Sequence, residues 1–138
     1  FASDPKPKAK GYERIAMVEF KRSLGDLADL PTDELPHRQM IRYARQILAG
    51  KAEHFRTHRP IQVTSDVRFY FYSVCEVSDR LLKRLTTEET FMPSPTGDGA
   101  FSVQNSGTYY FEYISLPKLL EDAQARNSAF FKRLGLEV

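Results

Sequence analysis

The stretch from Val67 to Val77, VRFYFYSVCEV, limits the folds open to this chain more than any other part of it. Its residues are mostly aromatic or β-branched, which favours a strand over a helix. The stretch is apolar on both faces through its middle, which is typical of a strand in the interior of a sheet. It also holds Cys75, the only cysteine, so the chain has no internal disulfide and no multi-cysteine zinc site. We expect a buried, inert thiol there.

A second apolar run, over residues 14–21, predicts a short strand in the centre of the sheet. A loop rich in Gly, Asp and Pro follows over residues 22–35. Pro36 fits the first turn of a helix that we expect to run to about residue 49, with Gly50 as its C-cap. Four apolar side chains at helical spacing are expected to pack on the sheet: Met40, Ala44, Ile47 and Leu48.

The C-terminal half continues the alternation of strands and helices. Ser78 is expected to cap a helix that runs to about residue 89, and a hairpin is predicted over residues 100–104 and 108–114. A last helix is predicted over residues 117–134. The side chains expected to be buried on these two helices are Leu81, Leu82, Leu85, Leu119, Leu120, Ala123, Phe130, Phe131 and Leu134. The order β-α-β-α-β-β-α predicts an α/β fold with a mixed central sheet flanked by helices.

The length of 138 residues predicts a single domain, in which residues 1–12 form a flexible N-terminal segment. No apolar run reaches the roughly 20 residues that a membrane-spanning helix needs, so we expect no membrane partner. A single cysteine fits a reducing, cytoplasmic setting best.

An acid and a base lie two residues apart at the end of the first predicted strand. Glu19 and Lys21 point to the same face, and Phe20 points to the other. A carboxylate beside an ammonium can hold a divalent cation and orient a water, with the Phe20 carbonyl as another oxygen ligand. Such a pair on a strand is also typical of an ordinary salt bridge. A metal site needs a second acid, and the only acid before Glu13 is Asp4.

Positive charge is concentrated between Pro36 and Pro60, where six cations accompany one acid, Glu53. These cations are Arg38, Arg42, Arg45, Lys51, Arg56 and Arg59. The segment fits a phosphate backbone, and it equally fits a solvated helix face. The same stretch contains all three histidines, His37, His54 and His58, whose spacing is not that of a metal site. We expect the histidines to lie at the surface.

The strand that ends in Glu19-Phe20-Lys21 and the helix that begins with Gln39-x-x-x-Tyr43 together resemble the PD-(D/E)XK nuclease superfamily, and within it the RecB-like branch. The resemblance implies a restriction-endonuclease-like core that uses Mg²⁺ or Mn²⁺. Glu19 would bind the metal, Lys21 would position the attacking water and Gln39 would orient ligand or phosphate oxygens. DNA would be bound by Tyr43 and by the arginines of the same helix. Those arginines are Arg38, Arg42 and Arg45.

The chain departs from the superfamily pattern before the first strand. The superfamily has a Pro-Asp motif that opens a strand paired with the E-x-K strand, preceded by another strand and a helix. Here the only Asp before Glu19 is Asp4, which precedes a proline instead of following one. We therefore expect a fragment of a longer protein, whose core lacks its first helix and hairpin because these lie upstream of Phe1. Asp4 is then a loop acid and a weaker candidate for the metal.

A closer resemblance extends over nearly the whole chain. The runs VEFKR and FYFYSVCEV, the loop PTGDG and the ending LLEDAQARNSAFFKRLGL look like the C-terminal domain of large bacterial ATP-binding proteins. Those proteins carry a GHKL-type ATPase at the N-terminus, so the resemblance implies an ATPase domain as a partner.

Three functions follow as expectations. The first is a magnesium-dependent nuclease, the phosphodiester-cleaving arm of a larger bacterial ATPase. The second is a non-catalytic module that kept the nuclease fold and recognises nucleic acid or a partner domain, which the missing second acid favours. The third is a purely structural dimerisation or docking domain, with the aromatic strands as its interface; a homodimer is one such arrangement.

Overall fold

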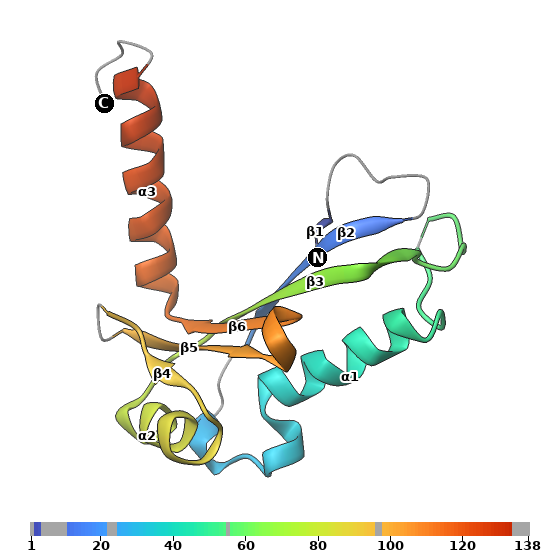
Figure 1. Ribbon diagram of the computed structural model, residues 1–138. Helices are drawn as coiled ribbons and strands as arrows, with labels where there is room; N and C mark the ends of the chain where they lie inside the picture. The colour runs from blue at the N-terminus through green and yellow to red at the C-terminus, as the bar shows by residue number, and fades with distance from the viewer. Residues whose placement is uncertain (1, 4–10, 22–24, 55, 96–97, 134–138) are drawn as a thin grey trace.

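Six strands form one mixed sheet in the order β1-β2-β3-β6-β5-β4 (Figure 1). The computed structural model describes residues 2–3, 11–21, 25–54, 56–95 and 98–133, with the backbone alone for 2–3 and 126–133. The strands are β1 (Ala2–Ser3), β2 (Tyr12–Phe20), β3 (Val63–Val74), β4 (Met92–Pro93), β5 (Gly99–Gln104) and β6 (Tyr109–Ile114). β3 runs parallel to both β2 and β6, and the other neighbouring pairs are antiparallel. The prediction of an α/β fold with a mixed sheet is therefore confirmed.

Three α-helices accompany the sheet: α1 (Pro36–Leu48), α2 (Asp79–Glu88) and α3 (Leu116–Arg133). The described residues also include three short 3₁₀ turns: η1 (Leu27–Asp29) and η2 (Thr32–Glu34) lie between β2 and α1, and η3 (Asn105–Gly107) joins β5 to β6. α1 and α2 lie on one side of the sheet, whereas α3 projects from the other side (Figure 1). None of the described helices is long and apolar enough to cross a membrane.

The predicted ends of α1 and α2 are confirmed. Pro36 occupies the start of α1, and Gly50, just after its end, has a φ of 71° that suits a glycine at this position. The Ser78 hydroxyl accepts a hydrogen bond from the Leu81 backbone N–H and so caps α2. Local capping chemistry was therefore enough to place both helices.

The core lies between the sheet and the pair α1 and α2. β3 occupies the interior of the sheet as predicted, and its side chains Phe69 and Phe71 are fully buried. The ring of Phe71 stacks on that of Phe111 from β6, with centroids 5.0 Å apart. Cys75 is buried as expected, and burial raises the pKa of its thiol to about 11. The thiol is therefore protonated at neutral pH and unreactive.

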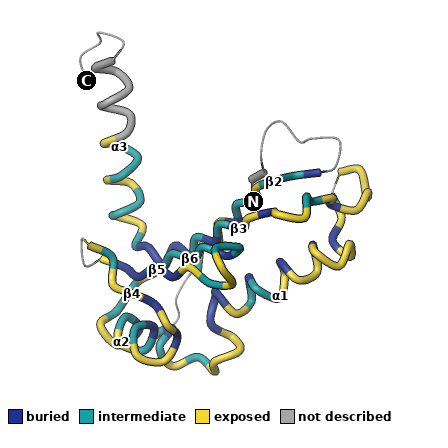
Figure 2. Tube along the Cα trace, in the orientation of Figure 1, coloured by how far each residue is buried: buried dark blue, intermediate teal, exposed yellow. Residues whose placement is uncertain are grey.

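The opposite face of the sheet is left largely open. Val18, Phe20 and Val103 are 45%, 65% and 61% exposed on it, and the outer surface of α1 is exposed as well (Figure 2). The prediction of burial is wrong for two side chains: Leu48 is 48% exposed and Leu120 is 61% exposed. Leu48 lies at the last position of α1, and Leu120 lies on the projecting α3, so neither meets the sheet. The predicted Phe130 and Phe131 are on the part of α3 without described side chains, and Leu134 lies outside the described residues.

The prediction that β2 is a central strand is wrong for its second half. β1 pairs with β2 only at Ala16 and Ile15, so in the described part of the chain residues 17–20 pair with β3 on one side and with no strand on the other. β1 lies within the segment that was predicted to be flexible, and β4 lies between the predicted second helix and the predicted hairpin. Strands of two residues carry no periodic pattern that a sequence could reveal.

Candidate functional site

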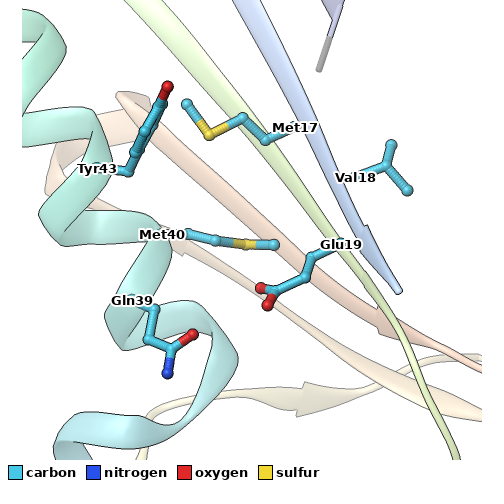
Figure 3. A pocket seen from close by; sticks show the side chains of 6 residues that line it. All are labelled: Met17, Val18, Glu19, Gln39, Met40 and Tyr43. Atoms are coloured by element: carbon cyan, nitrogen blue, oxygen red, sulfur yellow. The ribbon is translucent and has the colours of Figure 1, made fainter. Parts of the chain in front are cut away.

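A pocket of about 300 Å³ opens between the second half of β2 and the first turns of α1 (Figure 3). It exists because no described strand pairs with the outer edge of β2 beyond Ala16, the edge away from β3, while α1 returns across the buried face of the sheet on the way to β3. Six residues line it: Met17, Val18, Glu19, Gln39, Met40 and Tyr43. Three of them, Glu19, Gln39 and Tyr43, are residues that the sequence motifs selected, although 20 positions separate Glu19 from Gln39.

Lys21 links the two polar residues of this pocket. Its Nζ lies 2.8 Å from Glu19 Oε1 and donates to Gln39 Oε1 over 3.4 Å. Gln39 is oriented in turn, because its Nε2 donates to the Glu34 carbonyl at 3.2 Å. The side chains of Lys21 and Glu19 are 29% and 31% exposed, so both remain accessible from the solvent. The three predicted catalytic residues are thus brought into contact.

The backbone at the end of β2 also presents an oxygen. The Lys21 N–H donates to the Val74 carbonyl of β3 at 2.9 Å. In a trans peptide the carbonyl points opposite to the N–H, so the Phe20 carbonyl points away from β3, to the edge that β1 leaves uncovered. This direction agrees with its predicted use as a ligand. The Phe20 side chain lies on the opposite, open face.

The oxygen groups of this pocket are suitable ligands for a hard divalent cation, but only one of them, the Glu19 carboxylate, is negatively charged. Carboxylate, amide and carbonyl oxygens are ligands that Mg²⁺ accepts, and it is commonly held by one or two carboxylates together with substrate phosphates. Glu19 is the only carboxylate on the pocket wall. Among the described residues no group of three or more His, Cys, Asp or Glu side chains could hold a metal. Asp4, the predicted second acid, lies outside the described residues.

Tyr43 and the three arginines predicted to bind nucleic acid lie on neighbouring stripes of α1. Tyr43 lines the pocket one turn after Gln39 and is 41% exposed. Arg38, Arg42 and Arg45 are exposed at the spacing i, i+4, i+7 on the solvent side. Arg42 donates to the Asp33 carbonyl at 2.8 Å, and the Arg38 Nε pairs with Glu89 at 3.0 Å.

His37 is not at the surface, as was expected, but only 2% exposed. The Tyr113 hydroxyl lies 2.7 Å from its Nδ1, and Glu89 Oε1 lies 2.8 Å from its Nε2. These partners fix the tautomer: the hydroxyl donates to Nδ1, and the Nε2 proton goes to the carboxylate. The prediction failed because His37 follows Pro36 on the face of α1 that meets the sheet, where two distant residues supply its hydrogen bonds.

The surroundings of His37 keep its imidazole neutral. Burial lowers the pKa of His37 to about 4, against a raising effect of Glu89 and with a further lowering by Arg38 and Arg84. Burial raises the pKa of Glu89, but the hydrogen bonds from Arg38 and His37 outweigh this effect and hold the pKa below its ordinary value. The network therefore consists of a neutral histidine and an ionised glutamate that tie α1, the end of α2 and β6 together.

A second buried polar group, Ser73 on β3, lies beside the pocket. Ser73 is the register partner of Glu19 on one side and of Tyr113 on the other. It is 2% exposed, and its Oγ is the only buried side-chain nitrogen or oxygen in the described part of the chain without a hydrogen-bond partner. An unsatisfied buried hydroxyl costs about 1–3 kcal/mol. No sequence signal distinguishes Ser73 from an ordinary strand serine, since its isolation depends on three strands.

No family model matches the chain, and no curated protein or solved structure matches it either. The resemblances to PD-(D/E)XK nucleases and to the C-terminal domain of GHKL-type ATP-binding proteins therefore stay predictions. The case for a function depends on the pocket itself.

Proposed function

We propose that this chain is a magnesium-dependent nuclease domain of the PD-(D/E)XK type. One observation supports it above all: Glu19 on β2 and Gln39 on α1 line one accessible pocket, and Lys21, which directly follows β2, contacts both of them. An ordinary surface salt bridge would need Glu19 and Lys21 alone. Here the Gln39 amide oxygen also accepts from the Lys21 ammonium, and the hydrogen bond from Gln39 to the Glu34 carbonyl holds the amide in that orientation. Side chains held in place in this way are typical of a preformed polar site.

Each side chain has a distinct role in this proposal. Glu19 and the Phe20 carbonyl would provide oxygen ligands, and Gln39 would orient ligand or phosphate oxygens. Bound Mg²⁺ or Mn²⁺ would supply Lewis-acid polarisation of the phosphate and a more acidic water. Lys21 would hold the attacking water and offset the negative charge that grows on the phosphate oxygens. Tyr43 lies at the pocket wall, where it would contact the sugar or base next to the scissile phosphate.

The wider context belongs to the same proposal. DNA would lie along the solvent side of α1, where Arg38, Arg42 and Arg45 would contact its phosphates. The domain would serve as the cleaving arm of a cytoplasmic bacterial protein with a GHKL-type ATPase domain. A homodimer would be an additional arrangement of this arm.

Cleavage of a labelled DNA in Mg²⁺ tests the assignment, with Lys21→Ala as the decisive variant. We expect activity to fall by a factor of at least about 100, because the variant loses both the water-positioning group and the positive charge. Lys83→Ala, which removes a lysine from α2, serves as the control and should cleave like the parent. Cleavage that survives Lys21→Ala would rule out the assigned role.

Metal binding can be followed separately from cleavage. In a titration with Mg²⁺, the backbone NMR resonances of Glu19 and Lys21 should shift saturably, while those of α2 stay in place. An absence of shifts in the folded protein would mean that the Glu19–Lys21 pair is structural.

A specific observation favours a second candidate, a non-catalytic interaction module. The pocket has one carboxylate, and the open face of the sheet presents Val18, Phe20 and Val103 to the solvent. Large exposed apolar areas mark binding surfaces more often than monomer surfaces. This candidate predicts binding of nucleic acid or protein with no cleavage in any divalent cation.

A further inference from the structure

The orphaned hydroxyl of Ser73 lies next to the residue on which the proposed function depends most. Glu19 and Ser73 are direct register partners on the parallel strands β2 and β3. Neighbouring strands lie about 4.7–4.9 Å apart, so adjacent side chains on one face are within reach of each other. Both side chains lie on the α1 side: Glu19 lines the pocket, and Ser73 follows the buried Phe71 by two positions.

Glu19, Ser73, Tyr113 and Ala100 form one row of register partners across four strands, and the two members on the far side of Ser73 offer it no free hydrogen-bonding group. The Tyr113 hydroxyl is engaged with His37, and Ala100, its register partner on β5, is apolar. Lys21 contacts Oε1 of Glu19, and among the described residues Oε2 has no partner of its own. This row of register partners thus holds one hydroxyl without a nitrogen or oxygen partner, with the Cys75 thiol as its polar neighbour, beside one carboxylate with an oxygen to spare.

We propose that Ser73 is a positioning residue, whose hydroxyl donates to the Glu19 carboxylate when a divalent cation takes the place of Lys21 on it. This inference rests on the proposed function. A cation can approach Glu19 only if Lys21 moves, because the ammonium occupies Oε1 at 2.8 Å. Without Lys21 the carboxylate is free to rotate, and the buried Ser73 donor would fix it from behind. Carboxylate ligands of metals are commonly held by such hydrogen bonds.

The geometry also gives a reason for a serine on the buried face of an otherwise apolar strand. The buried face of β3 otherwise carries Val67, Phe69 and Phe71, and alanine at position 73 would remove an unsatisfied group at no cost in hydrogen bonds. A side chain that is unfavourable for folding and adjacent to a site is expected where the site needs it.

The test measures Mn²⁺ affinity by calorimetry on the parent, Ser73→Ala and Ser73→Thr, together with urea unfolding of each. We expect Ser73→Ala to weaken Mn²⁺ binding by roughly 10–100-fold without lowering the unfolding midpoint, and Ser73→Thr to restore binding. The control is Ser102→Ala. Ser102 is 4% exposed on the same face as Ser73, but its hydroxyl donates to the Thr90 carbonyl. The Ser102→Ala variant should therefore lose stability and keep its metal affinity.

A metal-free measurement checks the same contact. In a Lys21→Met background, the ¹³C shift of the Glu19 side-chain carboxyl at fixed pH should change when Ser73→Ala is added, and should not change when Ser102→Ala is added. Equal Mn²⁺ affinity in the parent and Ser73→Ala would overturn the role of Ser73 and leave the proposed function standing. No Mn²⁺ binding by the parent would overturn both. A loss of stability in Ser73→Ala equal to that in Ser102→Ala would show a structural hydrogen bond instead.

Discussion

Burial of His37 makes the stability of the fold depend on pH. Its pKa is about 4 in the folded chain, against 6.5 for an unperturbed histidine. Between these values the unfolded chain binds more protons, so the free energy of unfolding falls as the pH falls from about 6.5 to about 4. The difference corresponds to about 3 kcal/mol. Urea unfolding at steps between about pH 7.5 and 4 should show this loss.

Two variants test whether His37 causes this pH dependence of stability. His37→Asn removes the titrating group and should be less stable at neutral pH but nearly independent of pH in this window. His58→Asn is the control, because the His58 side chain is 80% exposed, and it should keep the full dependence. Glu89, whose folded pKa is lowered, adds a further loss below its ordinary pKa of 4.5. A pH dependence that survives in His37→Asn would contradict the assignment.

At the scale of single residues, the sequence predicted best the groups that a local motif identifies. Glu19, Lys21, Gln39 and Tyr43 were selected by the spacing of two short motifs, and the fold brings Glu19, Gln39 and Tyr43 to one pocket with Lys21 in contact with the first two. His37 was placed wrongly at the surface. Its partners Glu89 and Tyr113 are 52 and 76 positions away, and their contact requires α2 and β6 to be packed first.

Two glycines with positive φ lie at the ends of elements, Gly11 before β2 and Gly50 after α1. Gly11 precedes β2 with a φ of 113°, and a Cβ there would lie 2.4 Å from the Gln62 carbonyl oxygen. Gly50 follows α1 with a φ of 71°, and a Cβ there would meet nothing within 4 Å. Gly11→Ala should therefore destabilise the fold by clearly more than Gly50→Ala, for which about 1 kcal/mol is expected. Urea unfolding compares the two, and equal losses would show that the close approach at Gly11 is relieved by movement.

At the scale of elements, the register of β1 predicts where a second acid would complete the pocket. Ala2 pairs with Ala16 and Ser3 with Ile15, so an antiparallel extension of β1 would set the second position upstream of Phe1 opposite Glu19. Directly opposed residues share a face. A chain extended by a short β-forming segment with Asp at that second position should bind Mn²⁺ more tightly, by about tenfold or more, as a second carboxylate joins the site.

The control for this extension moves the acid by one position. Asp at the first position upstream of Phe1 would oppose Val18, whose side chain points to the open face, and should bring no gain in affinity. Calorimetry with Mn²⁺ on the two extended chains compares them directly. Equal affinities would mean that β1 does not continue along the uncovered edge of β2.

At the scale of the whole molecule, sequence patterns predicted the order of the helices and strands better than they predicted which of their faces are covered by other elements. The aromatic strand β3 lies inside the sheet because it is apolar on both faces, and the two inner helices follow their caps. The open face and the projecting α3 were not foreseen. Amphipathic spacing says which face of an element is apolar, but whether another element covers that face is a property of the complete packing.

The arrangement of charge on the whole molecule distinguishes the nucleic-acid functions from a purely structural one. If DNA lies along α1, its affinity should fall linearly with salt on a double-logarithmic plot, and Arg45→Ala should reduce that slope by about one. Arg45 suits this test because it is exposed on the solvent stripe of α1. Arg80→Ala is the control: Arg80 is engaged with Asp29 and Asp26, so its loss should leave the slope unchanged. Fluorescence anisotropy of a labelled oligonucleotide in EDTA measures both. Binding without salt dependence, or none at all, would leave docking through the open sheet face as the remaining function.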